Sequence, residues 1–166
     1  MEYDSGDQLE WRDTYFILFK RSHRPTVTQV ESTISGASRQ LKLEHLEADD
    51  DGMFASVLVQ APQDNAALEI SYETGDAVME QSAELARQLK DEVDAKQLKR
   101  MLDADARLDV MLFERVSGGT WSDPDEDEEE WEGGSLDPSS LLNVVQVLSK
   151  LTHGVAIDPA SGAIMS

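Results

Sequence analysis

The chain contains no cysteine among its 166 residues. This absence excludes disulfides, thiolate metal ligands and cysteine nucleophiles, and it is compatible with a reducing compartment. Long hydrophobic runs are also lacking, because no segment approaches the roughly 20 apolar residues that span a bilayer. The first ten residues are acidic and polar, unlike the basic and then apolar pattern of a signal peptide. We therefore expect a cytoplasmic protein that does not bind membranes.

Positive charge is scarce. The sequence has 14 lysines and arginines against 34 aspartates and glutamates, which gives a formal net charge of -20. Such a surface repels phosphate backbones, so direct nucleic-acid binding is not expected, whereas a basic partner protein is. The length and the 40% hydrophobic content suit one sizeable core. We predict a flexible N-terminal arm over residues 1–13 and a single domain over residues 14–166.

Alternating and continuous apolar runs predict an antiparallel or mixed sheet. The expected strands cover residues 15–19, 41–45, 53–60, 68–72, 108–113 and a terminal hairpin over 155–165. Helical segments lie between them, which indicates the α+β class with helices packed on one face of the sheet. The order of elements suggests a ferredoxin-like (split βαβ) arrangement with an extra C-terminal βαβ-type unit.

Capping signals place the starts of three helices. Thr26 and Gln29 form a capping box, Asp76 is a candidate N-cap, and Asp137 precedes Pro138 at the first turn of the last helix. A break near Asp94 is expected in the second helical segment. The apolar stripe of the last helix, with Leu141, Val145 and Leu148, is predicted to pack against the sheet that includes Phe16, Leu18, Val110 and Leu112.

An acidic segment flanked by two tryptophans interrupts this pattern at about residues 117–135. Its charge density is too costly to bury, so it forms either a contact surface or a solubilising insertion. Aromatic anchors with charge that steers encounter favour docking of a basic protein. The predicted partner-binding residues are Trp121, Asp123, Asp125, Glu126, Asp127, Glu128, Glu129, Glu130 and Trp131. A non-enzymatic interaction or regulatory domain is the favoured function, and an acidic mimic of nucleic acid is an alternative.

The densest basic cluster precedes the first helix, where free amides and the helix dipole favour an anion. This loop predicts an anion-binding site for a regulatory domain or a small enzyme, built from Lys20, Arg21, His23, Arg24 and Thr26. No glycine-rich loop accompanies it, and a surface loop that balances local acidity is the alternative interpretation.

Catalytic, cofactor and metal motifs are not recognised in the sequence. His23, His45 and His153 are widely separated, and neither an EF-hand loop nor a nucleophile elbow is present. We therefore assign no catalytic, cofactor-binding or metal-binding residue, and an enzyme is the less favoured interpretation.

The basic loop and the acidic segment each follow an apolar strand and precede a capped helix. If those strands are neighbours, both loops are expected at the same edge of the sheet. Lys20, Arg21 and Arg24 would then pair with the acidic segment, within one chain or across a homodimer.

Overall fold

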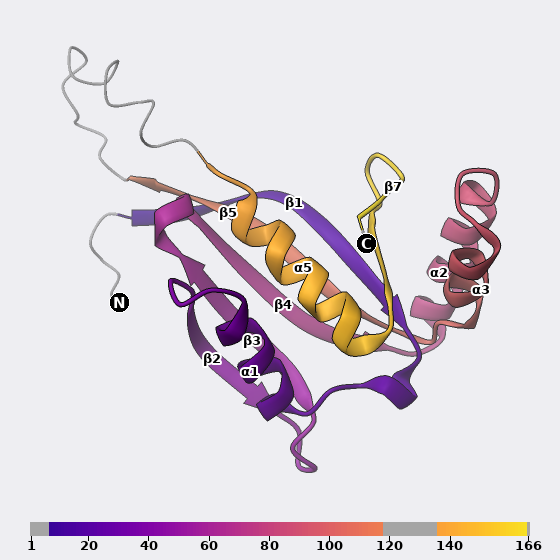
Figure 1. Ribbon diagram of the computed structural model, residues 1–166, viewed down its shortest axis with the longest axis horizontal. Coiled ribbons are helices and arrows are strands. Elements are labelled where there is room, and N and C mark those ends of the chain that lie inside the picture. Colours follow the sequence, from indigo (N-terminus) through magenta and orange to yellow (C-terminus); the bar gives the residue numbers. More distant parts are fainter. Residues whose placement is uncertain (1–6, 118–135, 166) are drawn as a thin grey trace.

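The computed structural model describes residues 7–117 and 136–165, which form one seven-stranded sheet (Figure 1). The strand order is β2-β3-β4-β5-β1-β6-β7, and every neighbouring pair is antiparallel. The strands are β1 (Asp7–Phe19), β2 (Lys42–Ala48), β3 (Phe54–Ala61), β4 (Ala66–Thr74), β5 (Ala106–Ser117), β6 (Val155–Asp158) and β7 (Ala163–Ile164). The α-helices of the described part are α1 (Val27–Ala37), α2 (Asp76–Leu89), α3 (Ala95–Asp103) and α5 (Ser139–Thr152). The α+β class and an antiparallel sheet are thus confirmed.

Strand β1 is longer than its apolar run predicts. It begins at Asp7 and pairs with the end of β5 as far as Trp11, where a bulge at Arg12 shifts the register. Residues 7–13 therefore belong to the sheet and not to an arm, because backbone pairing needs no apolar side chains. Residues 1–6 lie outside the described part of the chain.

Side-chain caps explain two of the four helix starts in the described residues, those of α1 and α3, whereas α5 begins at Ser139 with Pro138 and not the predicted Asp137 as its cap. Thr26 caps α1 through a capping box with Gln29, as predicted, and an unpredicted second box joins Asp94 and Gln97 at the start of α3. Asp76 is the first residue of α2 and not its cap, which is Gly75. Helix α2 can begin without a side-chain cap, because water can satisfy the first free amides of a helix.

Helices cover both faces of the sheet, which corrects the prediction of one covered face. The buried residues of α1 and α5 share a core with Ile17 and Phe19, whereas those of α2 and α3 share a second core with Leu18. In Figure 1, α1 and α5 cross in front of the strands, and α2 and α3 stand at one end of the sheet. The physical reason is the continuous apolar run of β1, which exposes apolar side chains on both faces.

The expected packing of α5 on the sheet is confirmed, although two of the four sheet residues named with it face the other side. Leu141, Val145 and Leu148 are in the same buried core as Val110 and Leu112. Phe16 and Leu18 lie on the opposite face with the α2 and α3 core, because side chains alternate along a strand.

The ferredoxin-like arrangement is not confirmed. Strands β1 and β2 are joined by α1, but β5, β4 and β3 lie between them in the sheet. At the C-terminal end, β5, α5 and β6 form a βαβ-type unit whose two strands are parallel to each other and are separated by β1. A split βαβ fold has four strands, whereas this sheet has seven.

Replacing Leu148 by alanine tests which face of α5 is buried. Leu148 has 0% exposed surface in the main core. The variant should lose about 2 to 5 kcal/mol of unfolding free energy in urea denaturation, because a cavity remains where the side chain was. Leu142 lies on the same helix but is 45% exposed, so Leu142→Ala should change stability by less than about 0.5 kcal/mol. A smaller loss for Leu148→Ala than for Leu142→Ala would contradict the assigned face.

Candidate functional site

Three segments that are distant in sequence meet at the carboxyl end of β1. Lys20 follows the strand and leads into a short 3-10 turn, η1 (Arg21–His23). Helix α3 reaches the same place because Met101 is buried against Leu18, and the end of α5 does so because β6 pairs with β1 immediately after it. The core on both faces of β1 therefore determines which surface side chains become neighbours.

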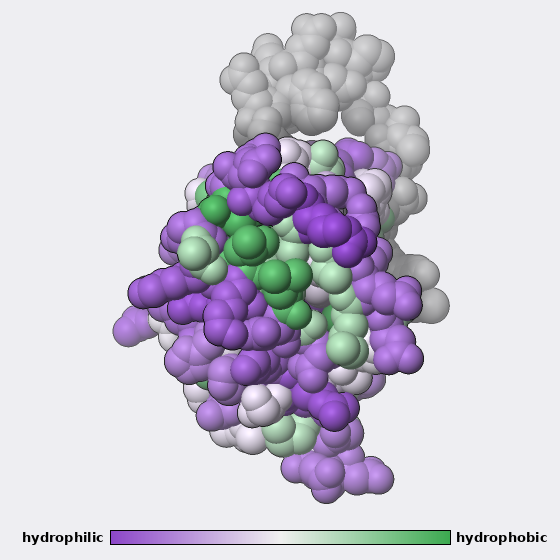
Figure 2. Space-filling model, turned by 90° about the vertical axis from the view of Figure 1, so that its right-hand side faces the viewer, coloured by the Kyte–Doolittle hydropathy of each residue, from purple (hydrophilic) through white to green (hydrophobic). Residues whose placement is uncertain are grey.

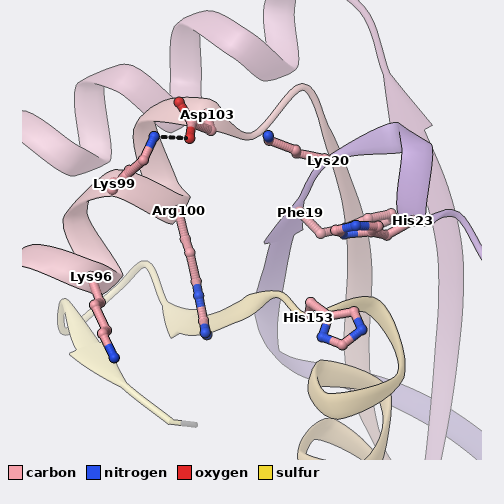
Figure 3. A pocket seen from close by; sticks show the side chains of 8 residues that line it. All are labelled: Phe19, Lys20, His23, Lys96, Lys99, Arg100, Asp103 and His153. Atoms are coloured by element: carbon pink, nitrogen blue, oxygen red, sulfur yellow. Dashed lines mark hydrogen bonds and ion pairs between the residues drawn. The ribbon is translucent and has the colours of Figure 1, made fainter.

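A pocket of about 360 Å³ opens between these segments and is named the first lobe. Figure 3 shows α3 on one side, and η1 and the end of α5 on the other. Arg100 extends from α3 toward the level of His153. The lobe is lined by Phe19, Lys20, His23, Lys96, Lys99, Arg100, Asp103 and His153.

A second lobe of about 670 Å³ adjoins the first, since Arg100 and His153 line both. Its other lining residues are Gln97, Gln146, Ser149, Lys150, Gly154, Val155 and Met165. The two lobes together are called the basic cleft. Their volumes fall in the range of small-molecule sites, roughly 300 to 1,000 Å³.

The side chains that line the basic cleft are mainly cationic, although the chain as a whole is acidic. Its lining includes the five basic residues Lys20, Lys96, Lys99, Arg100 and Lys150, but only one carboxylate, Asp103. Nζ of Lys99 lies 2.8 Å from Oδ2 of Asp103. This hydrogen bond raises the pKa of Lys99 and lowers the pKa of Asp103, to which nearby Lys20 adds a smaller lowering. The local charge is thus opposite in sign to that of the whole molecule.

Four of these cations have no partner of their own. Within residues 7–117 and 136–165, neither Lys20, Lys96, Arg100 nor Lys150 forms an ion pair. These four positive charges line the cleft without an ion pair in the described residues, and Asp103, which pairs with Lys99, is the one carboxylate in the lining; this excess of positive charge favours an anion.

Two histidines connect η1 with the end of α5. The rings of His23 and His153 lie edge to face with centroids 5.1 Å apart. His153 caps α5 in the left-handed region, with φ of 58°, and its backbone amide donates to the carbonyl of Lys150. Glycine or asparagine normally occupies such a C-terminal position. A histidine held there at a conformational cost is a feature that clusters at functional sites.

Gly154 allows the end of α5 to approach β1. A β-carbon at this position would lie 2.7 Å from the carbonyl oxygen of Leu18 and 2.9 Å from Oγ1 of Thr152. Glycine is therefore needed at position 154 because the backbone of β1 lies so close to it. The left-handed backbone conformation of this turn is adopted by His153 and not by Gly154.

The predicted basic loop divides into two groups. Lys20 and His23 line the first lobe. Arg21 instead turns to Asp105, whose Oδ1 accepts the backbone amide of Arg21 at 2.7 Å. Thr26 is occupied in the capping box of α1. Arg21 and Thr26 therefore do not belong to the cleft.

Arg24 has a structural role that removes it from the predicted site. Its Nη2 donates to the carbonyl oxygen of Phe54 at 2.8 Å, and Nη1 lies 3.0 Å from Oδ2 of Asp49. The guanidinium carbon also lies 4.0 Å from the ring centroid of Tyr72. These contacts fix the loop to β3 and β4. Asp49 accepts amide hydrogen bonds from Met53 and Asp51, and these, with Arg24, lower its pKa.

The residues that α3 contributes to the cleft were not predicted from the sequence. Lys96, Lys99 and Arg100 recur at the spacing that places side chains on one face of a helix. This pattern was available as a signal, but only the fold brings that face to Lys20 and His153.

The acidic segment lies outside the described residues, and with it all the predicted partner-binding positions from Trp121 to Trp131. Its two attachment points are nevertheless fixed. Strand β5 ends at Ser117, and the amide of Asp137 donates to the carbonyl of Asp64 beside β4. Both points are at the end of the sheet remote from the basic cleft.

The expectation that the basic loop and the acidic segment leave from one edge is wrong. Strands β1 and β5 are antiparallel, with Phe19 opposite Ala106 and Asp7 opposite Ser117. The loops that follow the two strands therefore leave from opposite ends. A strand of 13 residues separates those ends by about 40 Å at roughly 3.3 Å per residue.

Polar residues dominate the surface near α3. Figure 2 faces the end of the molecule that carries α2 and α3, and shows hydrophilic residues around a narrow hydrophobic strip.

In the described ranges no cluster of three or more histidine, aspartate or glutamate side chains is placed to hold a metal ion. None of the helices found there has the length and apolar character needed to cross a membrane.

No protein-family model, curated protein or solved structure matches this chain. Function is therefore inferred from the geometry and charge of the basic cleft.

Replacing Gly154 by alanine tests the close contact that supports the cleft. The added β-carbon would press on the backbone of β1, so thermal or urea unfolding should show a loss of about 1 to 3 kcal/mol. Gly36 is a control on α1, with no atom within 4 Å of the same added carbon. Gly36→Ala should stabilise the protein by about 0.5 to 1 kcal/mol, since alanine is the better helix former. Equal effects at both positions would argue against the contact.

Proposed function

We propose that the basic cleft binds a small anionic ligand and that this protein is a ligand-binding regulatory domain. The observation that carries the proposal is the convergence of Lys20, Lys96, Arg100 and Lys150, from three separate segments, on one cleft without ion-pair partners in the described structure. The chain has a net charge of -20, so such a concentration of positive charge is unusual within it.

Electrostatics favours a ligand over an empty cleft. Neighbouring cations repel one another, and this repulsion opposes the packing of α3 and α5 around β1. A bound anion converts the repulsion into attraction and forms charge-assisted hydrogen bonds, which are stronger than neutral ones. Binding to the folded state alone also stabilises the fold by mass action.

A basic protein that docks on the acidic segment between Trp121 and Trp131 is a second candidate function. This docking site would be separate from the basic cleft, because the attachment points of the acidic segment at Ser117 and Asp137 lie at the end of the sheet away from the cleft. Such a partner would leave the basic cleft accessible. The two proposals can therefore be tested by variants that do not interfere with each other.

Removing two cleft cations tests the anion site. In the variant Lys20→Gln with Arg100→Gln, inorganic phosphate should bind at least about tenfold more weakly in an NMR titration, because hydrogen bonds to charged groups are lost. The control, Arg39→Gln with Lys42→Gln, removes the same charge from exposed residues outside both lobes. Its dissociation constant should stay within about twofold. Equal weakening in both variants would indicate a general charge effect and not a site.

Neutralising the acidic segment tests the docking proposal. Replacing the carboxylates between Asp123 and Glu132 by their amides keeps the length of the segment and removes the charge that steers a basic partner. A partner captured by the natural chain should then bind more weakly, with a smaller salt dependence, in a binding measurement with purified components. The Lys20→Gln, Arg100→Gln variant should bind that partner normally. Unchanged partner affinity after neutralisation would exclude the acidic segment as the contact.

A further inference from the structure

The sequence itself contains an anionic group of the kind that the basic cleft favours. The acidic segment has eight carboxylates between Asp123 and Glu132, and six of them are consecutive, from Asp125 to Glu130. No lysine or arginine occurs from residue 118 to residue 135. The cleft has the complementary charge, because five basic residues and one carboxylate line it. Complementary charges of this kind steer two surfaces toward each other.

Within one chain, the acidic segment and the basic cleft are too far apart to meet. Ser117 lies at one end of the paired strands β1 and β5, and Phe19, which lines the cleft, lies at the other end, about 40 Å away. No residue of the segment is more than nine positions from the nearer of its two bordering residues, Ser117 and Leu136. Nine residues span at most about 30 Å when fully extended. The segment therefore falls short of the cleft of its own chain.

We infer that the acidic segment of one copy of this chain binds in the basic cleft of a second copy. This inference rests on the proposed function, because it needs a cleft that binds anions, and it names the second copy as a partner. In an antiparallel pair of copies, each segment lies beside the other copy's cleft, because the separation of about 40 Å is the same in both. Closed twofold dimers are the commonest oligomers of soluble proteins.

The overall charge of the chain is compatible with this contact. Two copies with a net charge of -20 each repel one another. Exposed charges farther apart than about 8 Å are, however, largely screened at physiological ionic strength. Carboxylates that touch Lys20, Arg100 or Lys150 are screened much less, since they are in contact with the opposite charge. The attraction is therefore retained under conditions that weaken the repulsion.

The contact also gives the proposed regulatory role a physical form. A small anion and the acidic segment of another copy would use the same cations, so each would exclude the other from the cleft. By linkage, an anion that weakens the association of two copies is itself bound more weakly by the dimer. The concentration of the small anion would thus control whether the chain is a monomer or a dimer.

Sedimentation velocity with the full chain tests the association. The natural chain should form dimers at about 0.15 M salt. In about 1 M salt, where the Debye length is about 3 Å, the dimer dissociation constant should rise at least about tenfold. Inorganic phosphate at about ten times its own dissociation constant, compared at equal ionic strength, should also raise that constant about tenfold by competition. A chain that stays monomeric at about 100 μM in 0.15 M salt would overturn the inference.

Matched carboxylate variants separate the contact from the general effect of charge. The segment variant carries four amides, Asp127→Asn, Glu128→Gln, Glu129→Gln and Glu130→Gln. The control variant removes the same charge from exposed residues outside both lobes, Glu31→Gln, Asp50→Asn, Glu80→Gln and Glu92→Gln. The segment variant should dimerise at least about tenfold more weakly, because it loses charge-assisted hydrogen bonds. The control should dimerise as well as the natural chain or better, since only repulsion is reduced. Equal weakening in both variants would contradict the contact.

Mixing two defective variants tests the pairing of segment with cleft. The cleft variant, Lys20→Gln with Arg100→Gln, keeps a natural acidic segment, and the segment variant keeps a natural cleft. An antiparallel pair of natural chains has two intact contacts, the mixed pair has one, and a pair of cleft variants has none. The mixture should therefore associate more weakly than the natural chain but more strongly than either variant alone. A mixture that associates no better than its components would show that the copies meet through another surface.

Failure of this inference is distinguishable from failure of the proposed function, because the phosphate titration measures the cleft without a second copy. If phosphate binds the natural chain and not the cleft variant, but the two dimerise equally or not at all, the anion site stands and a second copy is not its partner. If phosphate does not bind the natural chain, the proposed function fails as well.

Discussion

At the carboxyl end of β1, successive apolar side chains point to opposite faces of the sheet, and each face must be covered to bury them away from water. Ile17 and Phe19 enter the core beneath α1 and α5, while Leu18 enters the core beneath α2 and α3. Each fully buried side chain of this size contributes roughly 1.5 to 3 kcal/mol, so leaving either face open would be costly. The need to cover both faces brings α3 and the end of α5 to the same short stretch of β1. The basic cleft is the surface that results from this arrangement.

Helix dipoles explain part of the cation cluster but not all of it. Arg100 and Lys150 lie in the last turns of α3 and α5, where the negative end of the helix dipole favours positive charge. Lys96 lies in the first turn of α3, where the dipole disfavours a cation, and Lys20 lies on no helix. Local structure therefore does not account for Lys96 and Lys20. The proposed anion would account for both residues, since both line the cleft.

Local patterns in the sequence predicted local structure well. The capping box at Thr26, the hairpin of β2 and β3, the apolar stripe of α5 and the break at Asp94 are all present. Those features depend on residues within a few positions of one another. The position of β1 between β5 and β6, and the use of both sheet faces, depend on pairings across more than 80 residues. Lys20 and His23 were identified from local charge, but Lys96, Arg100 and His153 become their neighbours only through those long-range pairings.

The antiparallel pairing of β1 and β5 also sets the electrostatic relation between the two ends of the sheet. The basic cleft lies beside Phe19 and Ala106, and the acidic segment attaches beside the opposite ends of the same strands. A separation of about 40 Å is roughly five Debye lengths at physiological ionic strength. Charges held at those opposite ends of the strands are therefore screened from the cleft, and the proposed ligand would depend on short-range contacts with the cations that line it. Affinity for an anion then depends on the groups that touch it, which is why a chain of net charge -20 is compatible with an anion site.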